Sequence, residues 1–246
     1  MTKNFLDAAT READNLGGPY QKYVFRPLAA PFTILLAKTS LKPTSVTIFG
    51  LALGIMAAIF VANAETDQLF WGVIIWHLAK TCDFVDGNLA RKKNQKTYAG
   101  KMLDGMVDII VNIALLVGFG FHCGEPYKTA CLAVALLYLL GHFGYFRYQS
   151  LHDLMTTNKR LEEKNAINKK IKAEQVNGRL RTLRLFCDNL ATKTEANCIP
   201  LALVLGSLID QPALITFTLC FCLALRGGIN FFGSIFFTLL KLQIKR

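Results

Sequence analysis

Four aspartates lie in two closely spaced pairs within a stretch of the sequence that is otherwise largely apolar. Asp83 and Asp86 are three residues apart, and Asp104 and Asp108 are four residues apart. On a helix, either spacing places both carboxylates of a pair on the same face. Because an ionised carboxylate is costly inside a membrane span, residues of this kind indicate a functional site that supplies partners for the charge.

The two pairs are joined by a short segment, so we expect two antiparallel neighbouring helices whose four carboxylates converge. Converging anions repel one another unless positive charge neutralises them. Ligands that are all oxygen atoms favour hard ions such as Mg²⁺ or Mn²⁺. Two such ions can hold a phosphate diester and stabilise charge on the attacking and leaving oxygens of an in-line displacement. The pattern therefore predicts a metal centre that handles a phosphate ester, and solvated charges at headgroup level are the simpler alternative.

Small and basic residues accompany the aspartates at matching positions. Gly87 and Ala90 share the helix face of the first pair, and Gly100 precedes the second pair by about one turn. Glycine and alanine leave room for a flat ligand, such as a nucleobase, to approach the backbone. Arg91, one turn after Gly87, is placed to pair with a phosphate.

The composition places this chemistry in a membrane. The chain has 246 residues, of which 52% are hydrophobic, and its mean hydropathy is +0.33, which is too apolar for an ordinary soluble domain. Residues 1–40 interleave aromatic and basic side chains, so we expect an amphipathic helix in the membrane interface, with a soluble helix packed on the bundle as the alternative. Residues 41–246 are predicted to form an all-α integral membrane domain with six transmembrane helices. We expect these spans over about 44–64, 69–92, 99–122, 127–152, 196–208 and 212–240.

The excess of positive charge follows this topology. The formal net charge is +11, and basic residues gather between the second and third spans, at the C-terminus, and in a charged segment of about 153–194 that we expect to be a loop. Because cytoplasmic loops are enriched in Lys and Arg, the distribution predicts cytoplasmic N- and C-termini and an active site at the cytoplasmic face. It requires no nucleic acid as a partner. The seven cysteines form no CxxC pair, and we interpret them as small buried hydrophobes.

The motif as a whole resembles the signature of a known enzyme family. It reads Asp83-x-x-Asp86-Gly87-x-x-Ala90-Arg91, eight residues, then Gly100-x-x-x-Asp104-x-x-x-Asp108. Without a gap or a substitution, it is similar to the signature of the CDP-alcohol phosphotransferase (CDP-alcohol phosphatidyltransferase) family. Thr47 also matches a threonine that many members carry at the entry to the first span, whereas Thr44 replaces their asparagine.

The resemblance implies a role for each matching residue. The four aspartates at 83, 86, 104 and 108 would bind the metals, two ions in the family's manner, and Asp108 would also accept the proton of the attacking alcohol. The CDP moiety would contact Thr47, Asp83, Gly87, Ala90, Arg91 and Gly100. The usual family reaction transfers a phosphatidyl group from CDP-diacylglycerol to an alcohol or phospho-alcohol and releases CMP, and members are commonly homodimers.

The acceptor and the direction of transfer stay open at this point. Arg147 is a candidate for binding the phosphate of a phosphorylated acceptor, and a snorkelling interfacial residue is its alternative role. The basic run 159–184 is interpreted as a solvated helix that holds anionic lipid. Within the family, the alternative reaction moves a phospho-base from CDP-choline or CDP-ethanolamine to diacylglycerol.

Two other classes of protein use acidic residues in membrane spans. A membrane prenyltransferase would carry its two aspartate motifs in distant helices, whereas here both pairs lie in one helical hairpin. An ion transporter has no need for the Gly-Ala-Arg set, and its aspartates would more naturally lie near the bilayer midplane. The sequence therefore favours a phosphotransferase that synthesises phospholipid headgroups.

Overall fold

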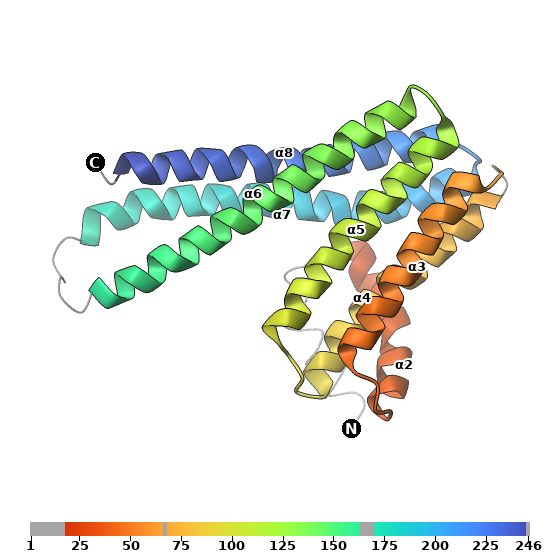
Figure 1. Cartoon of the computed structure of the whole chain (residues 1–246), viewed down its shortest axis with the longest axis horizontal. Helices are drawn as coiled ribbons and strands as arrows, with labels where there is room; N and C mark the ends of the chain where they lie inside the picture. Colours follow the sequence, from red (N-terminus) through yellow and green to blue (C-terminus); the bar gives the residue numbers. More distant parts are fainter. Residues whose placement is uncertain (1–17, 66–67, 163–169, 245–246) are drawn as a thin grey trace. The chain divides into compact units, whose positions relative to one another are not determined.

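All the regular secondary structure in the described part of the chain is helical. The computed structural model describes residues 18–65, 68–162 and 170–244, and it describes their side chains except at 98, 147–185, 188 and 237–244. Figure 1 shows the helices in order along the chain. They are η1, a π-helix (Gln21–Phe25), and the α-helices α2 (Arg26–Ala37), α3 (Pro43–Asn63), α4 (Leu69–Lys92), α5 (Tyr98–Cys123), α6 (Tyr127–Glu162), α7 (Lys170–Leu208) and α8 (Pro212–Ile244).

The predicted all-α membrane class is confirmed, while the count of six spans stays a prediction. Among the described residues, four segments are long and apolar enough to cross a membrane: Pro43–Asn63, Ala99–Cys123, Tyr127–Phe146 and Pro212–Phe236. Helices with this length and composition indicate a multi-pass membrane protein. α4 lies outside this group because its second half carries the charged motif residues. The predicted orientation of the termini and of the site also stays a prediction.

The segment of about 153–194, expected to be a cytoplasmic loop, contains long helical stretches, in line with the interpretation of its basic run 159–184 as a solvated helix, and its location in the cytoplasm stays a prediction. Most of it is helical, because α6 continues to Glu162 and α7 begins at Lys170. The segment lacks long apolar runs, which favours a loop over a membrane span, yet Lys, Arg, Glu, Leu and Ala are strong helix formers even where they are solvated. Low hydropathy therefore indicates the absence of a membrane span there, and it does not indicate the absence of a helix.

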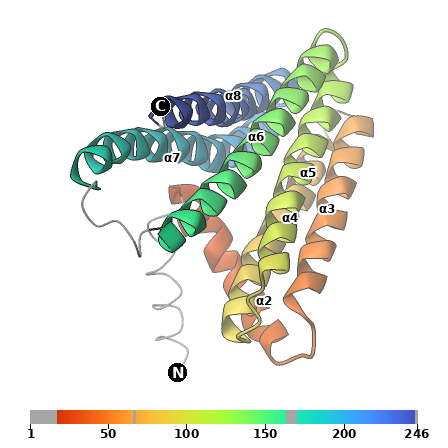
Figure 2. The ribbon, with the colours of Figure 1, turned by 60° about the vertical axis from the view of Figure 1, so that its left-hand side comes forward.

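The chain divides into two compact units, which we describe separately. The first comprises Met1–Ala133 and Ala196–Cys220, and the second comprises Val134–Glu195 and Phe221–Arg246. Both pairs of motif aspartates belong to the first unit. Figure 2 presents the same helices from a second direction.

In the first unit, α3 is the common neighbour of α4 and α5 (Figures 1 and 2). Glycine allows this close approach. A Cβ atom on Gly118 of α5 would lie only 2.6 Å from the carbonyl oxygen of Ala58 in α3, and one on Gly54 of α3 would lie 2.4 Å from Val111 in α5. The first contact is with backbone, which cannot move aside as a flexible side chain can. Small residues at such crossings let membrane helices pack at short range, and here they fix the frame that holds the motif.

The segment before α3 is attached to the outer side of α4. The ring of Phe25 is buried and stacks on Phe84 and on His77, with centroid distances of 5.5 Å in both cases. The hydroxyl of Tyr20 lies 2.9 Å from Nε2 of His77. At the other end of α2, Lys93 donates to the carbonyl oxygens of Thr39 and Leu41. These contacts hold α2 along α4. The predicted location of residues 1–40 in the membrane interface stays a prediction, and residues 1–17 lie outside the described part.

The second unit has a polar cluster of its own between α6, α7 and α8. The hydroxyl of Tyr138 donates to Glu195 at 2.9 Å, and Arg226 lies 3.8 Å from the same carboxylate and donates to Thr192. Gly227 lets α8 approach α6, because a Cβ there would lie 2.8 Å from the carbonyl oxygen of Leu137. Charged groups that are buried among apolar helices are usually paired in this way.

Candidate active site

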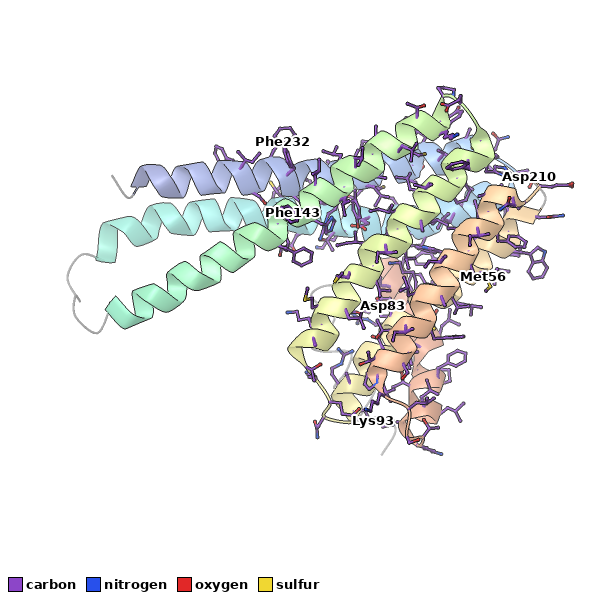
Figure 3. The ribbon with its side chains drawn as sticks, in the orientation of Figure 1. Met56, Asp83, Lys93, Phe143, Asp210 and Phe232 are labelled. Carbon is purple, nitrogen blue, oxygen red and sulfur yellow. The ribbon has the colours of Figure 1, made fainter. Side chains whose placement is uncertain are left out.

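The motif is carried by the end of α4 and the start of α5. α5 begins at a capped terminus, since the backbone N–H of Gly100 donates to the hydroxyl of Thr97 at 3.0 Å. A threonine at this position satisfies an N–H group that has no partner within the helix. The connection between Lys92 and Tyr98 is short, so the two helices present their charged ends at the same side of the first unit. Figure 3 shows Asp83 on α4 and Lys93 just beyond its end.

Three of the four aspartates come together. One carboxylate oxygen from each of Asp83, Asp86 and Asp104 lies within 4.8 Å of the other two. Asp86 is buried, with 4% of its surface exposed, while the other two are partly exposed. Oxygen atoms at such separations can bind one hard divalent cation in common. The predicted convergence is therefore present for three of the four carboxylates, and the metal-binding role itself stays a proposal.

Asp86 is held by a residue of α3. The hydroxyl of Thr47 donates to Oδ2 of Asp86, and both side chains are buried. The same hydroxyl lies 3.2 Å from the carbonyl oxygen of Pro43, one turn earlier in α3. Hydrogen bonds of this kind fix the orientation of a ligating carboxylate. The resemblance predicts that Thr47 contacts the CDP moiety, and the structure gives it a direct partner within the aspartate group.

Asp108 has a different partner, which the sequence patterns did not predict. Its Oδ1 accepts an ion-paired hydrogen bond from Nζ of Lys80, a residue of α4. The Nζ atom also lies 5.8 Å from the centroid of the Trp76 ring. A signal was available, because Lys80 lies three residues before Asp83 in an apolar helix, and a lysine at such a position requires an explanation as much as an aspartate does.

The aspartate group and the pair of Asp108 and Lys80 border the same small cavity. Asp108 and Lys80 line it together with two of the three clustered aspartates, so the fourth aspartate belongs to the same site. Apolar side chains and a glycine close the rest of the wall. The cavity is lined by Thr47, Gly50, Ala79, Lys80, Asp83, Asp86, Val107, Asp108 and Val111.

The residues predicted to contact the nucleotide lie toward the end of α4 and the start of α5. At Gly87, a Cβ would meet only the guanidinium group of Arg91, at 3.6 Å, and no packed helix backbone. Glycine here is therefore not required by helix packing, which fits the proposed space for a ligand. Arg91 is exposed and donates to Asn88. Ala90 and Gly100 are partly exposed, and their predicted contact with the nucleotide stays a proposal.

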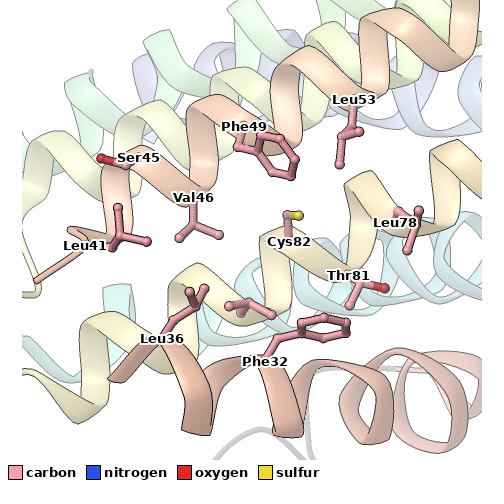
Figure 4. Close-up of a pocket in the computed structure, with 11 residues that line it drawn as sticks. Phe32, Leu36, Leu41, Ser45, Val46, Phe49, Leu53, Leu78, Thr81 and Cys82 are labelled. Carbon is pink, nitrogen blue, oxygen red and sulfur yellow. The ribbon is translucent and has the colours of Figure 1, made fainter. Parts of the chain in front are cut away.

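An apolar cavity lies on the other side of the motif helix. It has a volume of about 530 Å³ and lies between α2, α3 and α4. Figure 4 shows Cys82 pointing from α4 toward Val46 and Phe49 of α3, while Thr81 of the same helix lies near Phe32 of α2. Cys82 directly precedes Asp83 in the chain, so the same helix turn borders the polar site and the apolar space. The cavity is lined by Phe32, Leu36, Leu41, Ser45, Val46, Phe49, Leu53, Leu78, Thr81, Cys82 and Val85.

Arg147, predicted to bind the acceptor phosphate, is in α6, but its side chain lies outside the described part of the chain. Its role stays a prediction. Most of the basic run 159–184 falls within α6 and α7, again without described side chains. The described side chains therefore include the aspartate motif and do not include the residue predicted to bind the acceptor phosphate.

The comparison with known protein families bears on the chemistry of this site. Residues 41–153, which include both aspartate pairs, match the family model described as CDP-alcohol phosphatidyltransferase. This stretch, a little under half of the chain, has the sequence of a CDP-alcohol phosphatidyltransferase domain. The family predicted from the motif is thereby confirmed for this stretch, and with it the enzyme class at the level of the family, a transferase of substituted phosphate groups. The family assignment also favours this class over the membrane prenyltransferase and the ion transporter.

Two curated relatives of similar sequence are named as a synthase and as a phosphatidyltransferase. The chain is 30% identical over 121 residues to the phosphatidylinositol phosphate synthase of Streptomyces avermitilis, and the match covers 49% of each chain. It is 40% identical over 76 residues to the CDP-diacylglycerol–glycerol-3-phosphate 3-phosphatidyltransferase of Wigglesworthia glossinidia brevipalpis, covering 30% of this chain and 42% of that one. The similarity thus spans about half the length of these relatives or less.

A solved structure extends the likeness beyond the matched domain. The crystal structure of Mycobacterium tuberculosis phosphatidylinositol phosphate synthase in its apo form aligns with a TM-score of 0.51, over 83% of this chain and 93% of that one. The sequences are 18% identical over this alignment. At this identity the likeness shows a shared fold and carries no statement about substrate.

Proposed function

We propose that this chain transfers a phosphatidyl group from CDP-diacylglycerol to an alcohol or phospho-alcohol and releases CMP, as a step of phospholipid headgroup synthesis. The observation that carries the proposal is the group of Asp83, Asp86 and Asp104, whose carboxylate oxygens lie within 4.8 Å of one another. A family domain that contains these residues supports the reaction class.

The donor is proposed to be a lipid because of the apolar cavity beside the site. CDP-diacylglycerol joins a polar nucleotide to two acyl chains, so its binding site needs a polar region next to an apolar one. α4 supplies both, since Asp83 and Asp86 face the polar cavity while Cys82 and Val85 line the apolar cavity of about 530 Å³. Burial of an acyl chain contributes about 0.8 kcal/mol per CH₂ group, which favours a donor of this kind over CDP-choline or CDP-ethanolamine.

The residues around the cleaved bond have distinct proposed roles. Asp108 accepts the proton of the acceptor hydroxyl, because a neutral alcohol is a weak nucleophile and a carboxylate at hydrogen-bond distance activates it. Its side chain is 48% exposed, so an acceptor can reach it. The new bond forms between the acceptor oxygen and the β-phosphorus of the donor, and the bond to CMP breaks. Arg91 is exposed at the end of α4 and is proposed to pair with the diphosphate oxygens of the donor, including those of the departing CMP.

Mg²⁺ or Mn²⁺ fits the donor set of the aspartate group. Asp83, Asp86 and Asp104 would hold the first ion, and Asp108 is proposed to contribute to a second. The metal, when bound, would neutralise the carboxylates and stabilise the charge that develops on the phosphate oxygens. Thr47 keeps Asp86 oriented before the metal arrives, because its hydroxyl occupies one carboxylate oxygen.

The acceptor is proposed to be small and polar, and phosphorylated acceptors are the first to test. The relatives of similar sequence are named for the product phosphatidylinositol phosphate and for the acceptor glycerol 3-phosphate. Arg147 is retained as the proposed contact for the acceptor phosphate. We also propose a homodimer in the membrane with the site at the cytoplasmic face, in line with the family resemblance and the distribution of Lys and Arg.

A CMP-release assay on protein purified in detergent tests the proposal. CDP-diacylglycerol is combined with a panel of alcohols and phospho-alcohols, and CDP-choline and CDP-ethanolamine are combined with diacylglycerol, each with Mg²⁺ or Mn²⁺. We expect release with CDP-diacylglycerol and at least one acceptor. Asp83→Asn should abolish it, while Asp210→Asn, in the turn before α8, serves as a matched control because asparagine tolerates the positive φ of 50° found there.

A further inference from the structure

Lys80 supplies positive charge beside Asp108, a carboxylate that would otherwise need another cation to neutralise it. Its ammonium group pairs with Asp108, and both residues line the cavity that also contains Asp83 and Asp86. The group of three carboxylates that could share a metal ion, among the described residues, excludes Asp108. Asp108 therefore has a counter-ion from the protein itself, and it lies outside the group of three carboxylates that could share a metal ion.

The exposure of the pair argues against an ordinary interfacial lysine. A lysine that snorkels buries its methylene groups and extends its ammonium to water. Here the side chain of Lys80 is 14% exposed, whereas that of its partner Asp108 is 48% exposed. Lys80 is thus directed inward, toward the aspartates, and its Nζ lies near the ring of Trp76 as well. A lysine that is largely buried and directed at a charged site is expected to act on that site.

We propose that Lys80 is a positioning residue that competes with divalent metal for Asp108. By pairing with this carboxylate, it keeps Asp108 directed into the cavity as the base and lowers its affinity for a metal ion. Asp83, Asp86 and Asp104 then form the tighter metal site, and Asp108 binds metal only when Lys80 is displaced. This inference rests on the metal site of the proposed function, and it adds a residue outside the aspartate motif.

The test measures binding of Mn²⁺ to the purified full chain without any substrate, by the electron paramagnetic resonance signal of free Mn²⁺. Lys80→Met removes the charge and keeps a side chain of similar length. We expect Mn²⁺ affinity to rise about tenfold or more, or an additional ion to bind, because the Coulomb repulsion from a nearby ammonium is lost. Lys80→Arg keeps the charge and should bind Mn²⁺ like the wild type. Unchanged or weaker binding in Lys80→Met, in protein that elutes as the wild type does on size exclusion, would overturn the proposal.

A double-mutant cycle shows whether the effect passes through Asp108. In the Asp108→Asn background, Lys80→Met should change Mn²⁺ affinity by less than about threefold, because the two residues act as one pair. An equal change in both backgrounds would mean that Lys80 acts on the other aspartates by its charge alone, and the proposal would be wrong. Neither measurement uses CMP release, so absence of transfer with every donor would refute the proposed function and leave this result standing.

Discussion

Removal of the hydroxyl of Thr47 tests how the structure orients the metal ligands. Thr47→Val has nearly the same shape, so packing against α4 is retained while the donor to Asp86 is lost. A hydrogen bond to a charged group contributes about 1.5–3 kcal/mol, and each 1.4 kcal/mol corresponds to a factor of about ten. Since Asp86 is only 4% exposed, little water is available to replace the lost donor.

The expected loss is therefore roughly 10- to 150-fold in kcat/KM for CMP release, with a parallel loss in Mn²⁺ affinity. This range agrees with the effect of about 10–100-fold that is typical for residues that orient metal ligands. Thr47→Ser keeps the hydroxyl and should stay within about threefold of the wild type. Both quantities are measured on purified protein, the first by separation of CMP and the second by paramagnetic resonance. The reasoning is refuted if Thr47→Val resembles the wild type, or if Thr47→Ser loses as much.

Three further substitutions separate the steps of the reaction. Asp108→Asn should reduce CMP release by at least about 100-fold because it removes the base. Its affinity for the CDP donor, measured by calorimetry, should change little. Turnover near that of the wild type would exclude Asp108 as the base. Gly87→Leu should weaken donor binding by crowding the nucleotide, since only Arg91 lies near the added Cβ, and unchanged affinity would place the cytidine elsewhere. Leu53→Trp should raise KM for CDP-diacylglycerol several-fold by filling the apolar cavity. Ile48→Trp is the control, because Ile48 lies on the same helix but outside the cavity lining, and its KM should not rise. Equal effects of the two substitutions would exclude the cavity as the site of the acyl chain.

The helices and the motif were predictable from sequence because both depend on local patterns. Long apolar runs determined where α3, α5 and α8 form, and the three- and four-residue spacings placed each aspartate pair on one face. The same spacings, together with the small and basic residues beside them, were sufficient to indicate the family. Hydropathy alone did not predict how far α6 and α7 extend into 153–194, because it reports on burial in the membrane, while helix formation also depends on the propensity of charged residues.

The contacts between helices could not be read from local patterns. The position of α3 against both α4 and α5 depends on Gly54 and Gly118, whose roles become clear only when the facing residues are known. The same is true of Thr47, which is 39 residues from Asp86 in the chain, and of Lys80, which is 28 residues from Asp108. Periodicity within a helix shows which face a residue lies on, but not which residue of another helix it meets.

The most direct test of the central claim is whether the chain releases CMP from CDP-diacylglycerol in a reaction that depends on divalent metal and on the aspartate group. Purified protein is assayed with an acceptor panel, with Mg²⁺ or Mn²⁺, then with a chelator, and finally as Asp86→Asn. We predict CMP release together with a new phospholipid in the first case, and loss of both after chelation or substitution. CMP release that persists in the chelator or in Asp86→Asn would contradict the account, as would the absence of release from every CDP-linked donor.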